Sequence, residues 1–150
     1  MAGVMRRGLF FGLLAVAALA APSPARAAAC PFSARASAHS ESFEAAGYDS
    51  SPARLSRLAA LTRDRFAAAA RRLCEKGVLR PGDLRRYRRM VVQNGEGATE
   101  PVIYEDGLMG PGFFIFQFAF QNGGPPEPKA FEQAIRCWKR PQSPGCDLGD

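Results

Sequence analysis

The sequence predicts a small, disulfide-bonded α+β domain of an exported protein. Three observations predict it: an export-type start of the chain, four cysteines among 150 residues, and a helix-periodic segment followed by apolar runs of strand length. Within this class we expect a long N-terminal helix, a short second helix, a small antiparallel sheet that includes an aromatic strand, and a C-terminal helix.

The start of the chain has the three zones of a secretory signal peptide. Arg6 and Arg7 form a basic start, an apolar run covers residues 9–21, and Ala25 and Ala27 are the small residues of a cleavage site. The apolar run of 13 residues is shorter than the roughly 20 residues that cross a bilayer as a helix. We therefore expect residues 1–27 to be cleaved and residues 28–150 to form a single exported domain, periplasmic or secreted, without a transmembrane segment.

The four cysteines all follow the cleavage site, and an even number in a short exported chain favours two disulfides. Sequence alone allows three pairings. We favour Cys137–Cys146, because the Pro-Gln-Ser-Pro-Gly segment between them supplies turn chemistry, and this leaves Cys30 to pair with Cys74. A zinc site is the alternative, but the chain has no Cys-x-x-Cys pair and one histidine, so we expect no cofactor. Lipid attachment at Cys30 stays open.

The first part of the predicted domain contains the long helix. Residues 31–50 are rich in Ser and Ala, and residues 34–39 alternate alanine with polar side chains, which is typical of a short strand or an extended arm. Asp49-Ser-Ser-Pro52 is a helix start, and Gly77 supplies a stop. Between them, side chains that recur at steps of three and four form one stripe: Leu55, Leu58, Ala59, Thr62, Phe66, Ala69 and Leu73.

The next segment predicts a second helix and two strands. Asp83 is a candidate N-cap for a short helix that carries Leu84 and Tyr87 on one face. Residues 91–93 and 102–104 have strand chemistry, and Asn94-Gly95 is a strong turn signal between them. We therefore expect these two strands to form a hairpin or to lie side by side.

The run Phe113–Gln121 is the predicted aromatic strand. Strand alternation places four phenylalanines, at positions 114, 116, 118 and 120, on one face, which we expect to pack under the long helix as core. Pro128–Lys139 then predicts an amphipathic helix that carries Phe131, Ile135 and Trp138 and ends before Pro141.

The charge is unevenly distributed along the chain. The formal charge of +6 falls to +3 without residues 1–27, and the segment from Arg54 to Arg89 carries +9, with twelve basic and three acidic residues. In an exported protein such a surface favours anionic lipid, lipopolysaccharide or an acidic protein as partner, and we expect no nucleic acid. The alternative is a solvated helix face. The arginines that we expect to bind anions are Arg57, Arg63, Arg65, Arg71, Arg72, Arg85, Arg86, Arg88 and Arg89.

No catalytic motif is visible. His39 lies in an extended segment among serines and Glu41, where neighbouring side chains alternate faces and cannot form a triad. Acidic residues near the predicted loops could in principle support glycoside hydrolysis; they are Glu96, Glu100, Glu105 and Asp106. We therefore expect a non-enzymatic binding protein. Two alternatives stay open: a binder of lipid-like apolar ligands that uses the Phe113–Phe120 strand, and a small envelope hydrolase.

Overall fold

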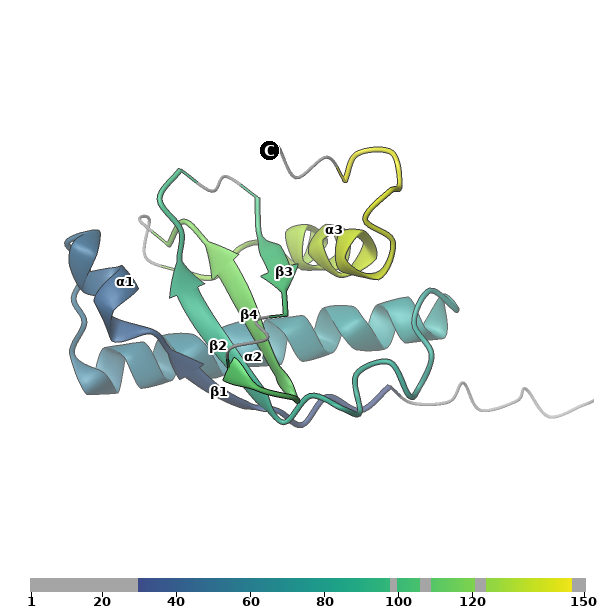
Figure 1. Ribbon diagram of the computed structural model, residues 1–150, viewed down its shortest axis with the longest axis horizontal. Helices are drawn as coiled ribbons and strands as arrows, with labels where there is room; N and C mark the ends of the chain where they lie inside the picture. Colours follow the sequence, from purple (N-terminus) through teal and green to yellow (C-terminus); the bar gives the residue numbers. More distant parts are fainter. Residues whose placement is uncertain (1–29, 98–99, 106–108, 121–123, 147–150) are drawn as a thin grey trace, which may run out of the picture.

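The computed structural model describes residues 30–97, 100–105, 109–120 and 124–146. Three helices and a four-stranded sheet make up a small α+β fold with two disulfides (Figure 1). The elements in chain order are β1 (Arg35–Ala38), α1 (Ser40–Ala45), α2 (Pro52–Glu75), β2 (Arg89–Asn94), β3 (Val102–Tyr104), β4 (Phe113–Phe118) and α3 (Pro128–Lys139). The predicted signal peptide, residues 1–27, lies outside the described residues.

The sheet is mixed, so the prediction of an antiparallel sheet is wrong. Its strand order is β1-β2-β4-β3, with β1, β2 and β4 parallel and β3 antiparallel to β4. The predicted pairing of β2 with β3 is also wrong, because β4 lies between them: Phe116 is the register partner of both Val92 and Ile103. The nearly continuous apolar run of β4 suits this central position, where a strand has neighbours on both sides and few polar side chains.

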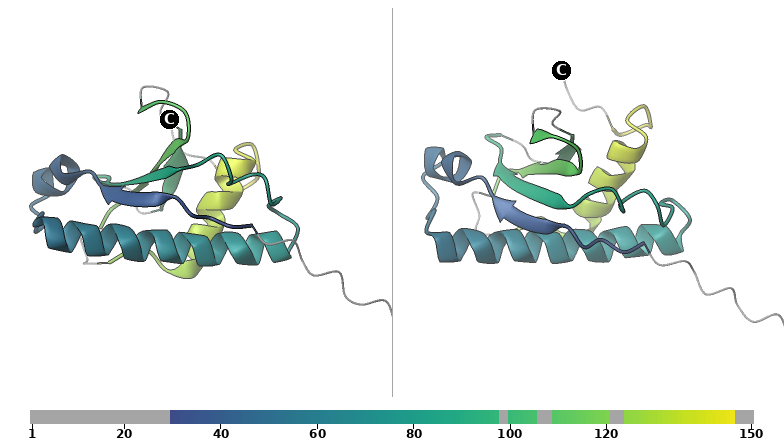
Figure 2. Two further views of the ribbon diagram at one scale, coloured as in Figure 1. Left: turned by 90° about the horizontal axis from the view of Figure 1, so that it is seen from below. Right: turned by 60° about the horizontal axis from the view of Figure 1, so that its bottom comes forward.

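Helices α2 and α3 pack on one face of the sheet (Figure 2). The ring centroid of Phe114 lies 5.3 Å from that of Phe66 on α2, as expected for the aromatic strand. Phe116 stacks on Phe131 of α3 with 4.9 Å between the ring centroids. Full burial of a phenylalanine stabilises a fold by about 1.5–3 kcal/mol. The core therefore lies between this face of the sheet and the two helices.

The ends of the two longer helices follow local sequence signals. Pro52 occupies the first turn of α2, where its missing N–H is not needed. Beyond the other end of α2, Gly77 has a φ of +70°, and the N–H of Val78 donates to the carbonyl of Leu73 at 2.8 Å. Helix α3 occupies the predicted residues, and Phe131 and Ile135 are buried on its inner side.

The predicted second helix is absent from the described residues between α2 and β2. The chain there forms consecutive turns, and the Asp83 carboxylate accepts a hydrogen bond from the N–H of Arg80, at 2.8 Å, which precedes it. An N-cap would instead accept from residues that follow it. A helix this short, with Gly82 beside its start, has little stability of its own. Leu84 and Tyr87 are still buried, and they anchor the turns to the core.

The segment before α2 contains both a strand and a short helix. The alternating residues form the edge strand β1, and α1, which the sequence does not predict, follows directly. Phe43 of α1 is fully buried, with its ring centroid 5.4 Å from those of Tyr48 and Phe120. The Ser42 hydroxyl accepts a hydrogen bond from the N–H of Asn94 at 3.0 Å. These contacts fix α1 beyond the last residues of β1 and β2.

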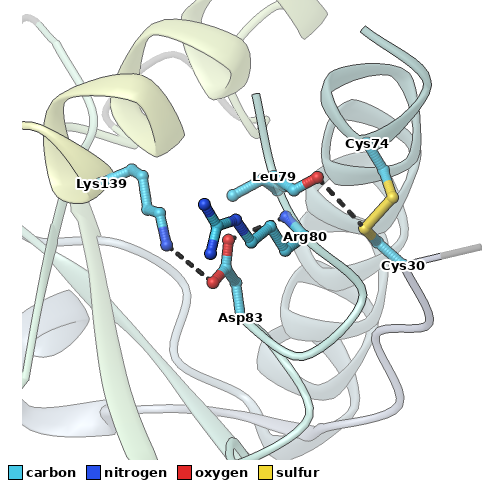
Figure 3. The surroundings of a disulfide bond; sticks show 6 residues. All are labelled: Cys30, Cys74, Leu79, Arg80, Asp83 and Lys139. Carbon is cyan, nitrogen blue, oxygen red and sulfur yellow. Dashed lines mark hydrogen bonds and ion pairs between the residues drawn. A yellow bond between two sulfur atoms is a disulfide. The ribbon is translucent and has the colours of Figure 1, made fainter. Parts of the chain in front are cut away.

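Both predicted disulfides are confirmed. Cys30 pairs with Cys74, which ties the first described residue to the end of α2, and Cys137 pairs with Cys146 across a separation of nine residues. Figure 3 shows the first disulfide beside Leu79, whose carbonyl oxygen lies 3.9 Å from the Cys30 sulfur. Each disulfide adds about 2–4 kcal/mol by restricting the unfolded chain. No helix in the described part of the chain is long and apolar enough to span a membrane.

Candidate functional site

The nine candidate arginines divide between two parts of the fold. Five lie on α2, and four lie at residues 85–89, in the segment that enters β2. Their contacts differ as well, because three of the five α2 arginines have partners within the fold, two of them outside the helix. The two groups therefore have to be considered separately.

Three arginines of α2 make contacts within the fold. Arg65 donates from Nη1 to the carbonyl oxygens of Pro125 and Pro126, at 2.8 and 2.9 Å. Arg72 donates to Glu132 of α3 at 2.8 Å, and Arg63 pairs with the adjacent Asp64. These bonds of Arg65 and Arg72 join α2 to α3 and to the loop before it.

The remaining two of the five candidate arginines on α2, Arg57 and Arg71, are exposed. Neither has an ion-pair partner among the residues that the structure describes. They are 14 residues apart, which places them close to the same side of the helix, opposite the buried stripe. They are available to solvent, but nothing in the fold brings them together.

The arginines before and in β2 are more exposed. Arg85, Arg88 and Arg89 have no carboxylate partner among the described residues. The guanidinium carbon of Arg89 lies 4.9 Å from the ring centroid of Phe113, within the range of a cation–π interaction. Arg86 differs from these three, because it pairs with Glu105 at 2.5 Å.

Arg35 of β1, which is not among the nine candidates, extends this group. Arg35, Arg89 and Phe113 are register partners across β1, β2 and β4, and we call them the arginine rung. Partners in a parallel sheet share a face, and the next residues, Met90 and Phe114, point into the core. The rung therefore lies on the face of the sheet opposite to α2 and α3. Neighbouring strands are about 4.8 Å apart, so Arg35 and Arg89 place two positive side chains next to each other.

Backbone hydrogen bonds fix the strands at the rung. The Gly112 carbonyl accepts from the N–H groups of Arg88 and Arg89 at 2.7 and 3.1 Å, and the N–H of Arg35 donates to the Arg88 carbonyl at 2.9 Å. Gly112 has a φ of +85°, and a Cβ there would lie 3.1 Å from the carbonyl oxygen of Arg86. This position therefore favours glycine, which lets β4 approach the arginine segment closely.

One of the nine candidate arginines, Arg86, lines a polar pocket of about 390 Å³. We call it the ion-pair pocket, because two ion pairs line it: Arg86 with Glu105 at 2.5 Å, and Lys139 with Asp83 at 2.7 Å (Figure 3 shows the second). Its walls come from the turns after α2, the residue after β3 and the end of α3. The lining residues are Gly82, Asp83, Arg86, Glu105, Trp138 and Lys139.

Tyr87 joins this pocket to the core. Its hydroxyl donates to Glu105 and accepts from Arg86, and its ring meets Trp138 edge-on with 5.7 Å between centroids. Burial and the hydrogen bond to Glu105 raise the pKa of Tyr87 to about 12. Burial alone would raise the pKa of Asp83, but hydrogen bonds from the Arg80 N–H and from Lys139 hold it below its usual value. Asp83 is therefore held as a carboxylate by two hydrogen bonds, one from the turn backbone and one from α3.

No protein-family model, no curated protein and no solved structure matches the chain. Its function has to be inferred from its own side chains. Among the described residues, no three His, Cys, Asp or Glu side chains lie together as metal ligands would.

The other candidate residues of the sequence lie apart. His39 follows β1 and is exposed, and its Nε2 lies 3.8 Å from a carboxylate oxygen of Glu41. Glu96 and Glu100 are exposed, Glu105 lines the ion-pair pocket, and Asp106 lies outside the described residues. The structure therefore brings one of the four candidate acids, Glu105, into a pocket.

The aromatic strand ends at Phe118 and not at the predicted Gln121, and the four phenylalanines predicted to share one face are packed against other rings. Phe114, Phe116 and Phe120 are at most 1% exposed. The depression that Phe66 and Phe114 help to line holds about 0 Å³ of open volume. Sequence reasoning missed Arg35, Trp138 and Lys139 as site residues. An outward position in an alternating strand was the only signal for Arg35, and the other two depend on how α3 meets the turns after α2.

Proposed function

We propose that this protein is an exported, non-enzymatic binding protein that contacts an anionic component of the cell envelope. The contact is made by the arginine rung, together with the exposed Arg85 and Arg88. One observation carries the proposal: Arg35 and Arg89 are adjacent and exposed, and neither has a carboxylate partner among the described residues. The phosphate groups of anionic lipids or lipopolysaccharide are the partner we favour.

Energetics support an anion at the rung. Like charges directly opposite in a sheet destabilise it by up to about 1 kcal/mol, and a bound phosphate would replace this repulsion by attraction. Each guanidinium presents several N–H groups in one plane, which match the oxygens of a phosphate. The Phe113 ring under Arg89 restricts that side chain, so that less conformational freedom is lost on binding.

The contrast with α2 favours the rung over the other arginines. Arg65 and Arg72 bind groups of the fold, so an external anion would have to compete for them. Arg57 and Arg71 are accessible, but they are separated along the helix. Only the rung, among the described residues, places two exposed arginines at the spacing of neighbouring strands.

Vesicle binding tests the proposal. We expect the mature protein to co-sediment with vesicles that contain phosphatidylglycerol and not with vesicles of phosphatidylcholine alone, and we expect added salt to weaken the binding. The double variant R35Q/R89Q should lose binding by about tenfold or more, a loss of about 1.4 kcal/mol. The control R57Q/R71Q removes the same charge from α2 and should bind nearly as well as the wild type.

Two results would contradict the proposal. Equal losses in both double variants would show that net charge, rather than the rung, drives binding. If no vesicles or lipopolysaccharide micelles bind, while an acidic protein from an envelope extract binds in a rung-dependent manner, the partner is a protein instead.

A further inference from the structure

We infer that the ion-pair pocket is a second binding site and that its ligand is a neutral saccharide. The inference does not depend on the arginine rung, because Arg35, Arg89 and Phe113 do not line this pocket. It rests on three properties of the lining: balanced charge, unused hydrogen-bonding groups and one partly buried indole.

Charge balance disfavours a charged ligand. The pocket contains two cations and two carboxylates, and each cation lies within 2.7 Å of a carboxylate. An anion, or the separated charges of an amino acid, would have to compete with these existing pairs. A neutral ligand can enter with both pairs intact.

The paired groups still have hydrogen-bonding capacity toward the pocket. The Arg86 side chain is 64% exposed, and only Nη2 of its three nitrogens has a partner among the described residues. The Glu105 side chain is 46% exposed, and both of its described contacts are at Oε1. Donors and acceptors thus lie next to each other. Sugar hydroxyls both donate and accept, so they can use such a mixed lining.

Trp138 supplies the apolar part of the site. It is partly buried against the core through Tyr87, and it is one of the six residues that line the pocket. A sugar ring has an apolar C–H face that can pack against such an aromatic surface while its hydroxyls reach the ion pairs. The pocket volume of about 390 Å³ lies within the range of about 300–1,000 Å³ that is usual for small-molecule sites.

The pocket wall is already ordered. Leu84 and Tyr87 are 2% and 3% exposed, and they anchor the turns that carry Gly82, Asp83 and Arg86. Asp83 connects these turns to α3 through Lys139 and to the backbone through the Arg80 N–H. Because these groups are fixed before binding, a ligand loses less affinity to the ordering of the protein.

The chain offers a direct probe, since Trp138 is its only tryptophan. The mature protein is titrated with chitotriose and with maltotriose, two neutral oligosaccharides, while its fluorescence and the heat of binding are recorded. We expect a saturable change in Trp138 emission with at least one of them. Glycylglycine, a zwitterion, and inorganic phosphate should produce no change at the same concentrations.

Variants locate the site. E105Q keeps the shape of the side chain but removes its charge. R86Q replaces the guanidinium by a shorter, uncharged amide. Each should weaken saccharide binding about tenfold, or 1.4 kcal/mol. The variants R57Q and R35Q/R89Q should bind saccharide as the wild type does. Circular dichroism and the unfolding temperature show whether each variant is folded, and E105Q alone suffices if R86Q is not.

Three outcomes would overturn the inference. They are the absence of binding by both oligosaccharides in fluorescence and calorimetry, binding that E105Q leaves unchanged, and binding of glycylglycine in their place. Failure here leaves the vesicle result untouched, and a failure of vesicle binding leaves the saccharide result untouched, because E105Q and R86Q test only the pocket, and R35Q/R89Q, the test of vesicle binding, is only a control here.

Discussion

The two faces of the sheet differ in burial where β2 and β4 begin. Met90 and Phe114 point toward α2 and α3 and are at most 1% exposed. Their immediate neighbours Arg89 and Phe113 point the other way, and Arg89 is exposed beside Arg35 of the next strand. At this end of β2 and β4, a shift of one residue therefore separates fully buried side chains from exposed or half-buried ones. This difference predicts that substitutions on the two faces will affect stability and binding in opposite proportions.

The largest expected effect is on the covered face. Phe116→Ala should lower the free energy of unfolding by about 3–5 kcal/mol, because it removes a fully buried ring that stacks on Phe131. Phe113→Ala is the matched control on the other face and should cost about 1 kcal/mol. Urea unfolding of both variants measures the difference. Equal costs would mean that the two faces are not distinct in energy.

A second prediction compares an arginine of α2 that binds another part of the fold with one that faces solvent. Arg65→Met keeps most of the apolar stem but leaves the buried carbonyls of Pro125 and Pro126 without this donor, so we expect a loss of about 1–3 kcal/mol. Arg57→Met, on the exposed side of the same helix, should change stability by less than about 0.5 kcal/mol. Urea unfolding again measures both. If Arg57→Met costs as much as Arg65→Met, the division of the α2 arginines into structural and free is wrong.

The ion pairs around α3 predict a dependence of stability on pH. Burial alone would raise the pKa of Glu132, but hydrogen bonds from Arg72 and Lys76 hold it below its usual value. The pKa of Asp83 is lowered in the same way by the Arg80 N–H and Lys139. A carboxylate with a lowered folded-state pKa stabilises the fold above its unfolded value, and this contribution disappears as pH falls through the folded value. Stability should therefore decrease as the pH falls below 4.5, the ordinary pKa of a Glu side chain, and decrease further below 3.8, the ordinary pKa of Asp.

The variant Glu132→Gln tests that dependence. Thermal unfolding between neutral pH and pH 3 should show a smaller loss of stability for the variant than for the wild type. Glu41→Gln is a control on an exposed side chain and should keep the wild-type profile. Parallel pH profiles for wild type and Glu132→Gln would show that this ion pair contributes nothing to the dependence.

Local sequence signals predicted much of the covered face. The spacing of Phe131 and Ile135, the alternation around Phe116 and the chemistry between Cys137 and Cys146 all act within a few residues, and the structure agrees with each. Strand order could not be predicted in this way. A two-residue turn signal at Asn94-Gly95 favours a hairpin, but it cannot reveal that a later strand pairs better with β2.

The arginine rung, on the face of the sheet opposite to α2 and α3, could not be predicted for the same reason. Arg35 and Arg89 are far apart in the sequence, and only the parallel register of β1 and β2 makes them neighbours. The ion-pair pocket likewise joins Arg86, Glu105 and Lys139 from three separate segments. The sequence shows that the segment is basic. It does not show which arginines pair with carboxylates that are distant in the sequence, as Arg72 does with Glu132 and Arg86 with Glu105.

The smallest expected effect on stability tests the comparison most directly. If the rung serves binding rather than folding, R35Q/R89Q should leave the free energy of unfolding within about 1 kcal/mol of the wild-type value, because the gain from removing two adjacent like charges offsets the loss of the cation–π contact between Arg89 and Phe113. Salt should reduce that gain, since it screens exposed charges. Unfolding at low and high salt, measured beside vesicle binding, separates the two roles. A double variant destabilised by more than about 1 kcal/mol would show that the two arginines support the sheet, and the rung would then have to be assigned to structure as well.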